Sequence, residues 1–255
     1  MVKRIDLNCD MGESFGAYKI GCDELVLPYI TTANVACGFH AGDPMVMAAT
    51  VKAAKENGVG VGAHPGYPDL VGFGRRKMTL SFEEIKNDVL YQTGALMAFL
   101  KAQGMKMQHM KPHGALGNLA MADEKVAAAV CEAVCELDKD LYMFGHANSV
   151  MLKVAKSYGL KTVSEVYGDR AYLDDGHLVP RSRPGAVIHD TEFAVKRAVR
   201  MVTEGVVESI DGKIIEIQAD SLCVHGDTPA ALEFIKQIRA ALEAEGVAIK
   251  NLAAE

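Results

Sequence analysis

The sequence lacks several features that would define a class of protein. No window approaches about 18 uninterrupted apolar residues, which argues against a membrane-spanning helix. The six cysteines include no CxxC pair. Cys131 and Cys135 lie four residues apart on an expected helix and are interpreted as small core residues rather than a redox or metal pair. Tryptophan is absent, and this absence, together with thirteen methionines, identifies no cofactor.

Basic clusters and nucleotide motifs are missing as well. The 255 residues carry a formal net charge of −6, which argues against a nucleic-acid-binding surface. No GxxxxGK[ST] motif occurs, so the chain has no evident nucleotide site of its own. The N-terminus enters an acidic strand without the apolar core of a signal peptide. We therefore expect a cytoplasmic protein with no membrane attachment.

The stretch from Ile5 to Glu13 is the most unusual strand candidate. If it is extended, Asp6, Asn8 and Asp10 share one face, while apolar side chains occupy the other. Six further segments also run apolar and then end in polar residues beside glycine. This pattern predicts that the first strand belongs to a barrel whose polar groups converge at one end.

Segments of strand character alternate with helical segments along the chain. Strands are predicted at residues 5–13, 31–37, 59–63, 105–110, 141–144, 161–166 and 221–224. Local signals mark the helices, such as the cap Asp43 before Pro44 and the capping box of Ser81 with Glu84. The alternation favours an α/β protein with a parallel sheet. Polar ends on all strands favour a closed seven-stranded barrel over an open sheet, which gathers ligand groups at one switch point.

One barrel domain is expected over residues 1–255. Residues 206–218, with Asp211-Gly212 at their middle, look like an appended hairpin. Residues 168–189 form the longest stretch without regular periodicity, and such a loop is usually a lid or a binding loop.

Four histidines directly follow predicted strands: His40, His64, His113 and His225. One histidine in such a position is typical of a structural hydrogen bond, whereas four in equivalent positions indicate a shared site. His146 is a candidate fifth member. The remaining histidines, His109, His177 and His189, are interpreted as structural or exposed.

Asp10 lies nearest the end of the first strand and is the candidate general base or metal ligand. The acidic residues here could instead brace the barrel floor, but carboxylates are costly to bury without partners. With His40 and His64, Asp10 would offer the oxygen and imidazole ligands that zinc or manganese accepts. The long spacing fits no standard zinc signature. A divalent metal site and a metal-free carboxylate and imidazole network that activates water are therefore both kept as interpretations.

Cationic side chains also follow the predicted strands: Arg75, Arg76, Lys111 and Arg170. On a protein of negative net charge, cations at a polar mouth indicate a carboxylate or phosphate substrate. Surface ion pairs are the alternative interpretation for Arg75 and Arg76, and Lys111 is the stronger candidate.

Six blocks at these strand ends resemble the LamB/YcsF family. They are IDLNCDMGESFG at 5–16, NVACGFHAGDP at 34–44, GAHPGYPDLVGFGRR at 62–76, KPHGAL at 111–116, EVYGDRAYLDDGHLVPR at 165–181 and CVHGDTP at 223–229. The similarity spans nearly the whole chain in the family's order. The chain departs from the family at Gly117, where Tyr is usual, and at Gly168, where Ala is usual, and neither change removes a polar candidate.

This resemblance implies a seven-stranded (β/α) barrel similar to the glycoside hydrolase/deacetylase superfamily. It also implies one component of an ATP-dependent 5-oxoprolinase, which opens 5-oxoproline (pyroglutamate) to L-glutamate with partner subunits B and C handling ATP. The predicted catalytic residues are Asp10, His40, His64, Lys111, His113 and Glu165. The predicted substrate-binding residues are Asn8, Glu13, Arg75, Arg76, Arg170, His225 and Asp227.

Two other functions stay open on the sequence. One is a stand-alone metal-dependent deacetylase or amidohydrolase, because the related superfamily uses Asp and His at a barrel mouth. The other is a non-catalytic subunit that binds a carboxylate and positions it for a separate enzyme.

Overall fold

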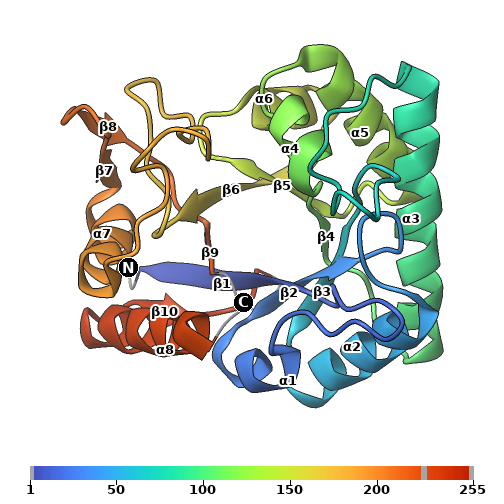
Figure 1. The fold of residues 1–255 in the computed structure, drawn as a ribbon, viewed down its shortest axis with the longest axis horizontal. Helices are drawn as coiled ribbons and strands as arrows, with labels where there is room; N and C mark the ends of the chain where they lie inside the picture. Colours follow the sequence, from blue (N-terminus) through green and yellow to red (C-terminus); the bar gives the residue numbers. More distant parts are fainter. Residues whose placement is uncertain (1–2, 225–228, 253–255) are drawn as a thin grey trace.

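A computed structural model describes residues 3–224 and 229–252. Its centre is a closed barrel of seven parallel strands (Figure 1). They are β1 (Arg4–Met11), β2 (Thr32–Ala36), β3 (Gly60–His64), β4 (His109–Met110), β5 (Tyr142–His146), β6 (Lys161–Tyr167) and β9 (Ser221–Cys223). The barrel closes through β9, which pairs with β6 on one side and with β1 on the other. The predicted seven-stranded α/β barrel is confirmed.

Helices surround the barrel, and several of them begin where the local sequence predicts. They are α1 (Asp23–Val26), α2 (Pro44–Glu56), α3 (Phe82–Ala102), α4 (Gly114–Ala120), α5 (Glu124–Leu137), α6 (Val150–Ser157), α7 (Thr191–Glu204) and α8 (Pro229–Ala244), with a short 3-10 helix η1 (Leu27–Tyr29) after α1. Asp43 accepts backbone hydrogen bonds at the start of α2, and Ser81 with Glu84 forms the capping box of α3. Among the described residues no helix combines the length and apolar character needed to cross a membrane.

Two segments differ from the sequence prediction. The fourth strand was expected over residues 105–110 but is shorter, His109–Met110, because Met105 still donates to the Leu100 carbonyl at the end of α3. Helix α4 was not predicted. It contains Gly114 and Gly117, which lower helix propensity, and it begins directly after the polar loop.

Three short strands lie outside the barrel. β7 (Val206–Glu208) and β8 (Ile214–Glu216) pair antiparallel within the segment expected to form a hairpin, and they lie beside α7 in Figure 1. Gly212 has a φ of +88° in the turn between them, which glycine adopts without steric cost. β10 (Ala248–Ile249) was not predicted and adds in parallel to the first residues of β1.

The inside of the barrel is polar. Asp6, Asn8 and Asp10 on β1 bond to side chains from neighbouring strands, while the alternate residues of β1 pack in the apolar core against the helices. Asn34 on β2, for example, donates to both Asn8 and Asp10 at 2.8 Å. Buried polar groups are tolerated when they satisfy one another, so the polar face of β1 is the start of a network rather than a defect.

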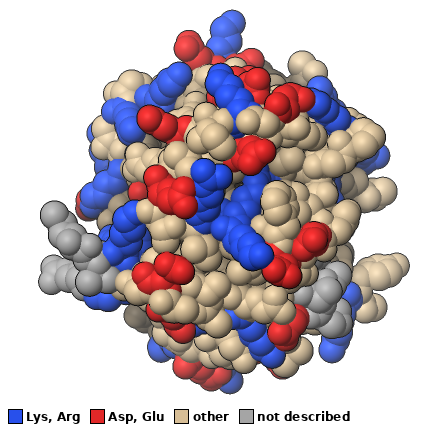
Figure 2. All heavy atoms as spheres, turned by 90° about the vertical axis from the view of Figure 1, so that its left-hand side faces the viewer, with Lys and Arg blue, Asp and Glu red and all other residues tan. Residues whose placement is uncertain are grey.

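The face that carries α7 and α8 has mixed charges. Figure 2 shows lysine and arginine interspersed with aspartate and glutamate on this face. Several of them pair along one helix, such as Lys196 with Glu192 at 2.7 Å and Arg200 with Glu204 at 2.8 Å. Exposed pairs of this kind contribute only about 0.3–0.5 kcal/mol each to stability.

Candidate functional site

A cavity of about 760 Å³ opens at the ends of the barrel strands. Asp10, His64, Lys111, His113 and Tyr167 line its inner part. The carboxyl ends of the strands are the usual active-site end of a (β/α) barrel. The predicted convergence of polar strand ends therefore occurs at the face where chemistry is expected.

Lys111 holds the centre of the site. Its ammonium nitrogen lies 3.0 Å from Oδ1 of Asp10, 2.7 Å from Oε1 of Glu165 and 3.2 Å from Oδ1 of Asn8. Burial alone would lower the pKa of Lys111, but the neighbouring Asp10, Cys223 and Glu165 raise it well above its ordinary value. These carboxylates therefore favour the cationic form of Lys111.

Asp10 is the carboxylate of the site that reaches the cavity. Its side chain is 24% exposed, and its Oδ2 lies 3.4 Å from Nε2 of His64. Burial opposes ionisation, yet the charges of His64 and Lys111 hold the pKa of Asp10 well below its usual range. Asp10 is thus a carboxylate anion at neutral pH, fixed on one oxygen by Lys111 and Asn34.

Glu165 is the second carboxylate bound to Lys111, and it is almost fully buried. The hydroxyl of Tyr167 donates to its other oxygen. Tyr167 was not predicted from the sequence, although it lies two residues after Glu165 on β6 and so points to the same side of the strand. Asn34 was also not predicted as a site residue. It lies two residues after Thr32 on β2, so the two side chains point to the same side of the strand.

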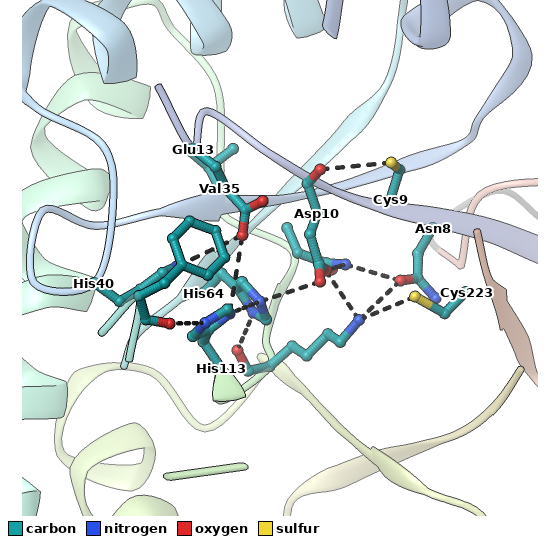
Figure 3. Close-up of polar contacts among 12 residues, drawn as sticks. Asn8, Cys9, Asp10, Glu13, Val35, His40, His64, His113 and Cys223 are labelled. Carbon is teal, nitrogen blue, oxygen red and sulfur yellow. Dashed lines mark hydrogen bonds and ion pairs between the residues drawn. The ribbon is translucent and has the colours of Figure 1, made fainter. Parts of the chain in front are cut away.

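Three of the predicted histidines come together beside Asp10. The rings of His40 and His113 stack with centroids 3.6 Å apart, and the ring of His64 stands edge-on to His113 at 4.8 Å. Nδ1 of His64 lies 2.7 Å from the Lys111 carbonyl, and Nε2 of His113 lies 2.9 Å from the Phe73 carbonyl. Their other nitrogens, Nε2 of His64 and Nδ1 of His113, face each other at 3.0 Å (Figure 3).

Glu13 completes this cluster at the edge of the cavity. Its Oε1 lies 3.7 Å from Nε2 of His40 and 3.9 Å from Nδ1 of His113. Burial, reinforced by the charge of Asp10, raises the pKa of Glu13 to about 7. One ligand atom from each of Glu13, His40, His64 and His113 lies within 4.8 Å of the others, so the group could hold a metal ion. The set differs from the predicted ligands in having Glu13 and His113 in place of Asp10.

The cationic candidates occupy three different environments. Arg75 is exposed, lines the cavity and lies over the ring of Phe73 at 5.2 Å. Arg170 also lines the cavity, but its guanidinium donates to the backbone carbonyls of Val179 and Ala186 in the 168–189 loop. Arg76 is not part of the cavity wall and donates to Asp69, as in the surface ion-pair interpretation. Arg181, which was not a predicted site residue, lines the cavity.

The remaining predicted residues lie around this centre. Asn8 is fully buried beneath Lys111 and contacts it rather than the cavity. His146 lines the cavity, and so does His177, which had been interpreted as structural or exposed. His109 is buried, with Nε2 2.7 Å from Oδ1 of Asn34, in agreement with a structural role. The other two predicted site residues, His225 and Asp227, lie outside the described residues.

The sequence profile of the LamB/YcsF family matches residues 5–255. The chain belongs to the LamB/YcsF family. A curated relative from Campylobacter jejuni subsp. jejuni, named as the A component of 5-oxoprolinase, is 56% identical over 246 residues and covers 96% of each chain. The solved structure of a lactam utilization protein from Thermus thermophilus is 48% identical, covers 98% of this chain and 100% of its own, and superposes with a TM-score of 0.94.

A more distant similarity concerns the fold alone. A solved structure described as T48 deacetylase with substrate is 16% identical, covers 98% of this chain and 89% of its own, and has a TM-score of 0.50. The shared architecture agrees with the expected likeness to deacetylase barrels. The site of this LamB/YcsF protein therefore has to be interpreted from its own residues.

Gly117 and Gly168, the two expected departures from the family pattern, are both closely packed. A Cβ at Gly117 would lie 2.5 Å from the carbonyl oxygen of Pro112, so a larger residue there requires the backbone to shift. A Cβ at Gly168 would lie 3.1 Å from Cβ of Ala198 on α7, a tight but less severe contact. Gly117 lines the cavity.

Proposed function

We propose that this protein is the ring-opening component of an ATP-dependent 5-oxoprolinase, converting 5-oxoproline to L-glutamate with partner subunits B and C. The proposal is carried by the 56% identity, over 96% of both chains, to a relative named as the A component of 5-oxoprolinase. The sequence has no GxxxxGK[ST] motif, which agrees with ATP being handled by the partners. The cytoplasm, where ATP is available, is the proposed location.

The chemistry gives a reason for this division of labour. A five-membered lactam is a stabilised amide, so its hydrolysis needs a strong oxyanion site or prior activation of the carbonyl. In the proposed reaction the partners transfer a phosphoryl group from ATP to the lactam oxygen. Water then adds to the ring carbon, the ring C–N bond breaks and the nitrogen takes a proton. The resulting acyl phosphate reacts with a second water to give glutamate and phosphate.

Asp10 is the group placed to orient the attacking water. It is a carboxylate anion, partly exposed to the cavity and fixed by Lys111 and Asn34 on one oxygen. Its low pKa makes it a weak base in the resting site, so proton transfer to Asp10 or His64 would accompany bond formation rather than precede it. Lys111 stays protonated and stabilises negative charge at the base of the cavity.

Arg75 and Arg181 are the proposed holders of the substrate's carboxylate and phosphate. Both line the cavity and both are exposed. Guanidinium groups bind these anions through paired N–H donors. Residues 177–181 of the long loop form one wall, and Arg170 fixes that wall by donating to the carbonyl of Val179. The loop would shield the labile intermediate from bulk water.

A metal-dependent amidohydrolase that works alone is the second candidate. The observation that favours it is the cluster of Glu13 with three histidines at the cavity. Zinc sites with an open position activate water for amide cleavage without ATP. The two candidates therefore differ in their requirement for ATP and partners.

The test is glutamate release from 5-oxoproline by the purified chain, with each component omitted in turn. The proposed function requires this chain, subunits B and C, and ATP together. Glutamate formed by this chain alone, without ATP, would contradict the proposal and support the metal-dependent amidohydrolase.

A further inference from the structure

Among the described residues, the buried imidazole of His40 has no hydrogen-bond partner. Its side chain is completely buried, and neither ring nitrogen has a hydrogen-bond partner among the described residues. An unsatisfied buried polar group costs about 1–3 kcal/mol, so such a group in a crowded site indicates a missing ligand. Oε1 of Glu13 lies 3.7 Å from Nε2 of His40.

Glycines make room for this imidazole. A Cβ at Gly66 would lie 2.7 Å from Nδ1 of His40, and a Cβ at Gly74 would lie 2.7 Å from Cβ of His40 and 2.9 Å from Cδ2 of His113. The space around the stacked rings is therefore fitted to them. The surrounding backbone encloses the ring of this unpaired histidine closely, so the side chain is held in a defined position.

The hydrogen bonds of His64 and His113 fix which nitrogens carry protons. A backbone carbonyl oxygen can only accept, so Nδ1 of His64 must donate to the Lys111 carbonyl and Nε2 of His113 to the Phe73 carbonyl. In the neutral rings the lone pairs then lie on Nε2 of His64 and Nδ1 of His113. These two atoms are 3.0 Å apart, so two lone pairs face each other unless a cation lies between or beside them.

We propose that Glu13, His40, His64 and His113 bind one divalent transition-metal ion of the zinc type. Three imidazole nitrogens and one carboxylate oxygen are ligands that zinc prefers, at about 2.0–2.2 Å from the ion, which places tetrahedral ligand atoms about 3.4 Å apart. Three of the separations among the four ligand atoms are 3.0, 3.7 and 3.9 Å. The rings of His40 and His113 are stacked and parallel, so the ring of His40 has to rotate before its Nε2 and Nδ1 of His113 point at the same ion.

The carbonyls of Lys111 and Phe73 support this assignment. Metal-binding histidines usually donate their second N–H to a carbonyl or carboxylate, which orients the ring and leaves the other nitrogen free for the ion. Both His64 and His113 have this arrangement. A shared proton would satisfy the contact between His64 and His113 but would leave both nitrogens of His40 without a partner among the described residues, whereas a metal ion would also engage Nε2 of His40.

The site adjoins the Lys111 network, because Oδ2 of Asp10 lies 3.4 Å from Nε2 of His64. A bound ion would supply Lewis-acid stabilisation of negative charge in the cavity. The inference adds a metal site to the proposed function but does not depend on it, because ion binding is measured without turnover. Failure of metal binding and failure of glutamate release are therefore distinguishable.

The experiment begins with the full chain stripped by a chelator and titrated with zinc chloride against a chromophoric competitor. One ion per chain is expected. Removing one ligand with Glu13→Gln or His113→Ala should weaken zinc binding at least about 100-fold, since loss of even an outer-shell partner costs about 10–100-fold. His189→Ala, which removes an exposed imidazole, is the matched control and should bind as the wild type does.

Cobalt(II) provides a second measurement that needs no variant to fold. The wild-type protein loaded with one Co²⁺ should give the intense visible absorption of a four- or five-coordinate site. Failure to retain zinc in the wild type, equal zinc affinity in folded Glu13→Gln protein, or a weak six-coordinate cobalt spectrum would each overturn the proposal.

Discussion

The ammonium nitrogen of Lys111 lies 3.0 Å from a carboxylate oxygen of Asp10, although the two residues are 101 positions apart in the sequence. The same nitrogen lies 2.7 Å from Glu165. One buried cation therefore holds two carboxylates from opposite parts of the chain. The charge state of Asp10 and the stability of the barrel floor both depend on it.

Replacing Lys111 with Met should lower the free energy of unfolding by about 3–5 kcal/mol, because it leaves buried carboxylates without their cation. Adding Glu165→Gln to Lys111→Met should restore part of the loss, since one of the two charges is then removed. Urea unfolding of the two variants and the wild type measures both effects. Lys161→Met is the control, because the side chain of Lys161 is 52% exposed and its ion pair with Asp140 contributes about 0–1 kcal/mol. A Lys111→Met protein as stable as the wild type would contradict the account.

Asp6 should make stability depend on pH. Burial raises its pKa from 3.8 to about 6, although Ser221, Thr31 and Thr32 donate to it. The native carboxyl group binds its proton more tightly than the unfolded chain does. Its contribution to stability is therefore complete below about pH 4 and is lost as the pH rises to about 6.

Asp6→Asn removes this titration. The stability of the wild type relative to Asp6→Asn should fall by up to about 3 kcal/mol between about pH 4 and pH 6.5, since one pKa unit corresponds to about 1.4 kcal/mol. Urea unfolding of both proteins across this range measures the difference. A difference that does not change with pH would show that Asp6 titrates normally in the native barrel.

Arg75 and Arg170 should differ in what their removal changes. Arg75→Ala should raise the KM for 5-oxoproline on the order of 10-fold or more, as expected for the loss of a charge-assisted contact, without changing stability. Arg170→Ala should lower the unfolding free energy by about 1.5–3 kcal/mol or more, because it removes hydrogen bonds from a charged donor to the carbonyls of Val179 and Ala186. Arg76→Ala is the control for KM, since Arg76 pairs with Asp69 outside the cavity wall. An unchanged KM for Arg75→Ala would remove Arg75 as a substrate ligand.

Much of the barrel could be predicted because its signals are local. The alternation of polar and apolar residues along β1, the cap at Asp43 and the capping box at Ser81 each depend on neighbours within a few positions. Helix α4 was missed because Gly114 and Gly117 are poor helix formers, and tertiary packing decides its conformation. β10 was missed because two residues carry too little periodicity to be recognised.

The residue types of the site could be predicted from the sequence, but the contacts among them could not. Strand ends rich in His, Asp and Lys indicated that Asp10, His64 and Lys111 would meet, and they do. The sequence could not distinguish Asp10 from Glu13 as the neighbour of His40, since that depends on side-chain directions after β1. It also could not show that backbone carbonyls fix the rings of His64 and His113, because these contacts join different strand ends and loops.

The most direct test of the central claim compares wild-type and Asp10→Asn protein in the complex with subunits B and C, 5-oxoproline and ATP. The asparagine keeps an oxygen for Lys111 and Asn34, so the fold should be retained. Glutamate release should nevertheless fall by about 10²–10⁴-fold, the usual contribution of an acid–base group. Asp140→Asn, which alters an 88% exposed carboxylate, should leave the rate unchanged. Full glutamate release by the Asp10→Asn complex would contradict the claim that this site directs water to the ring.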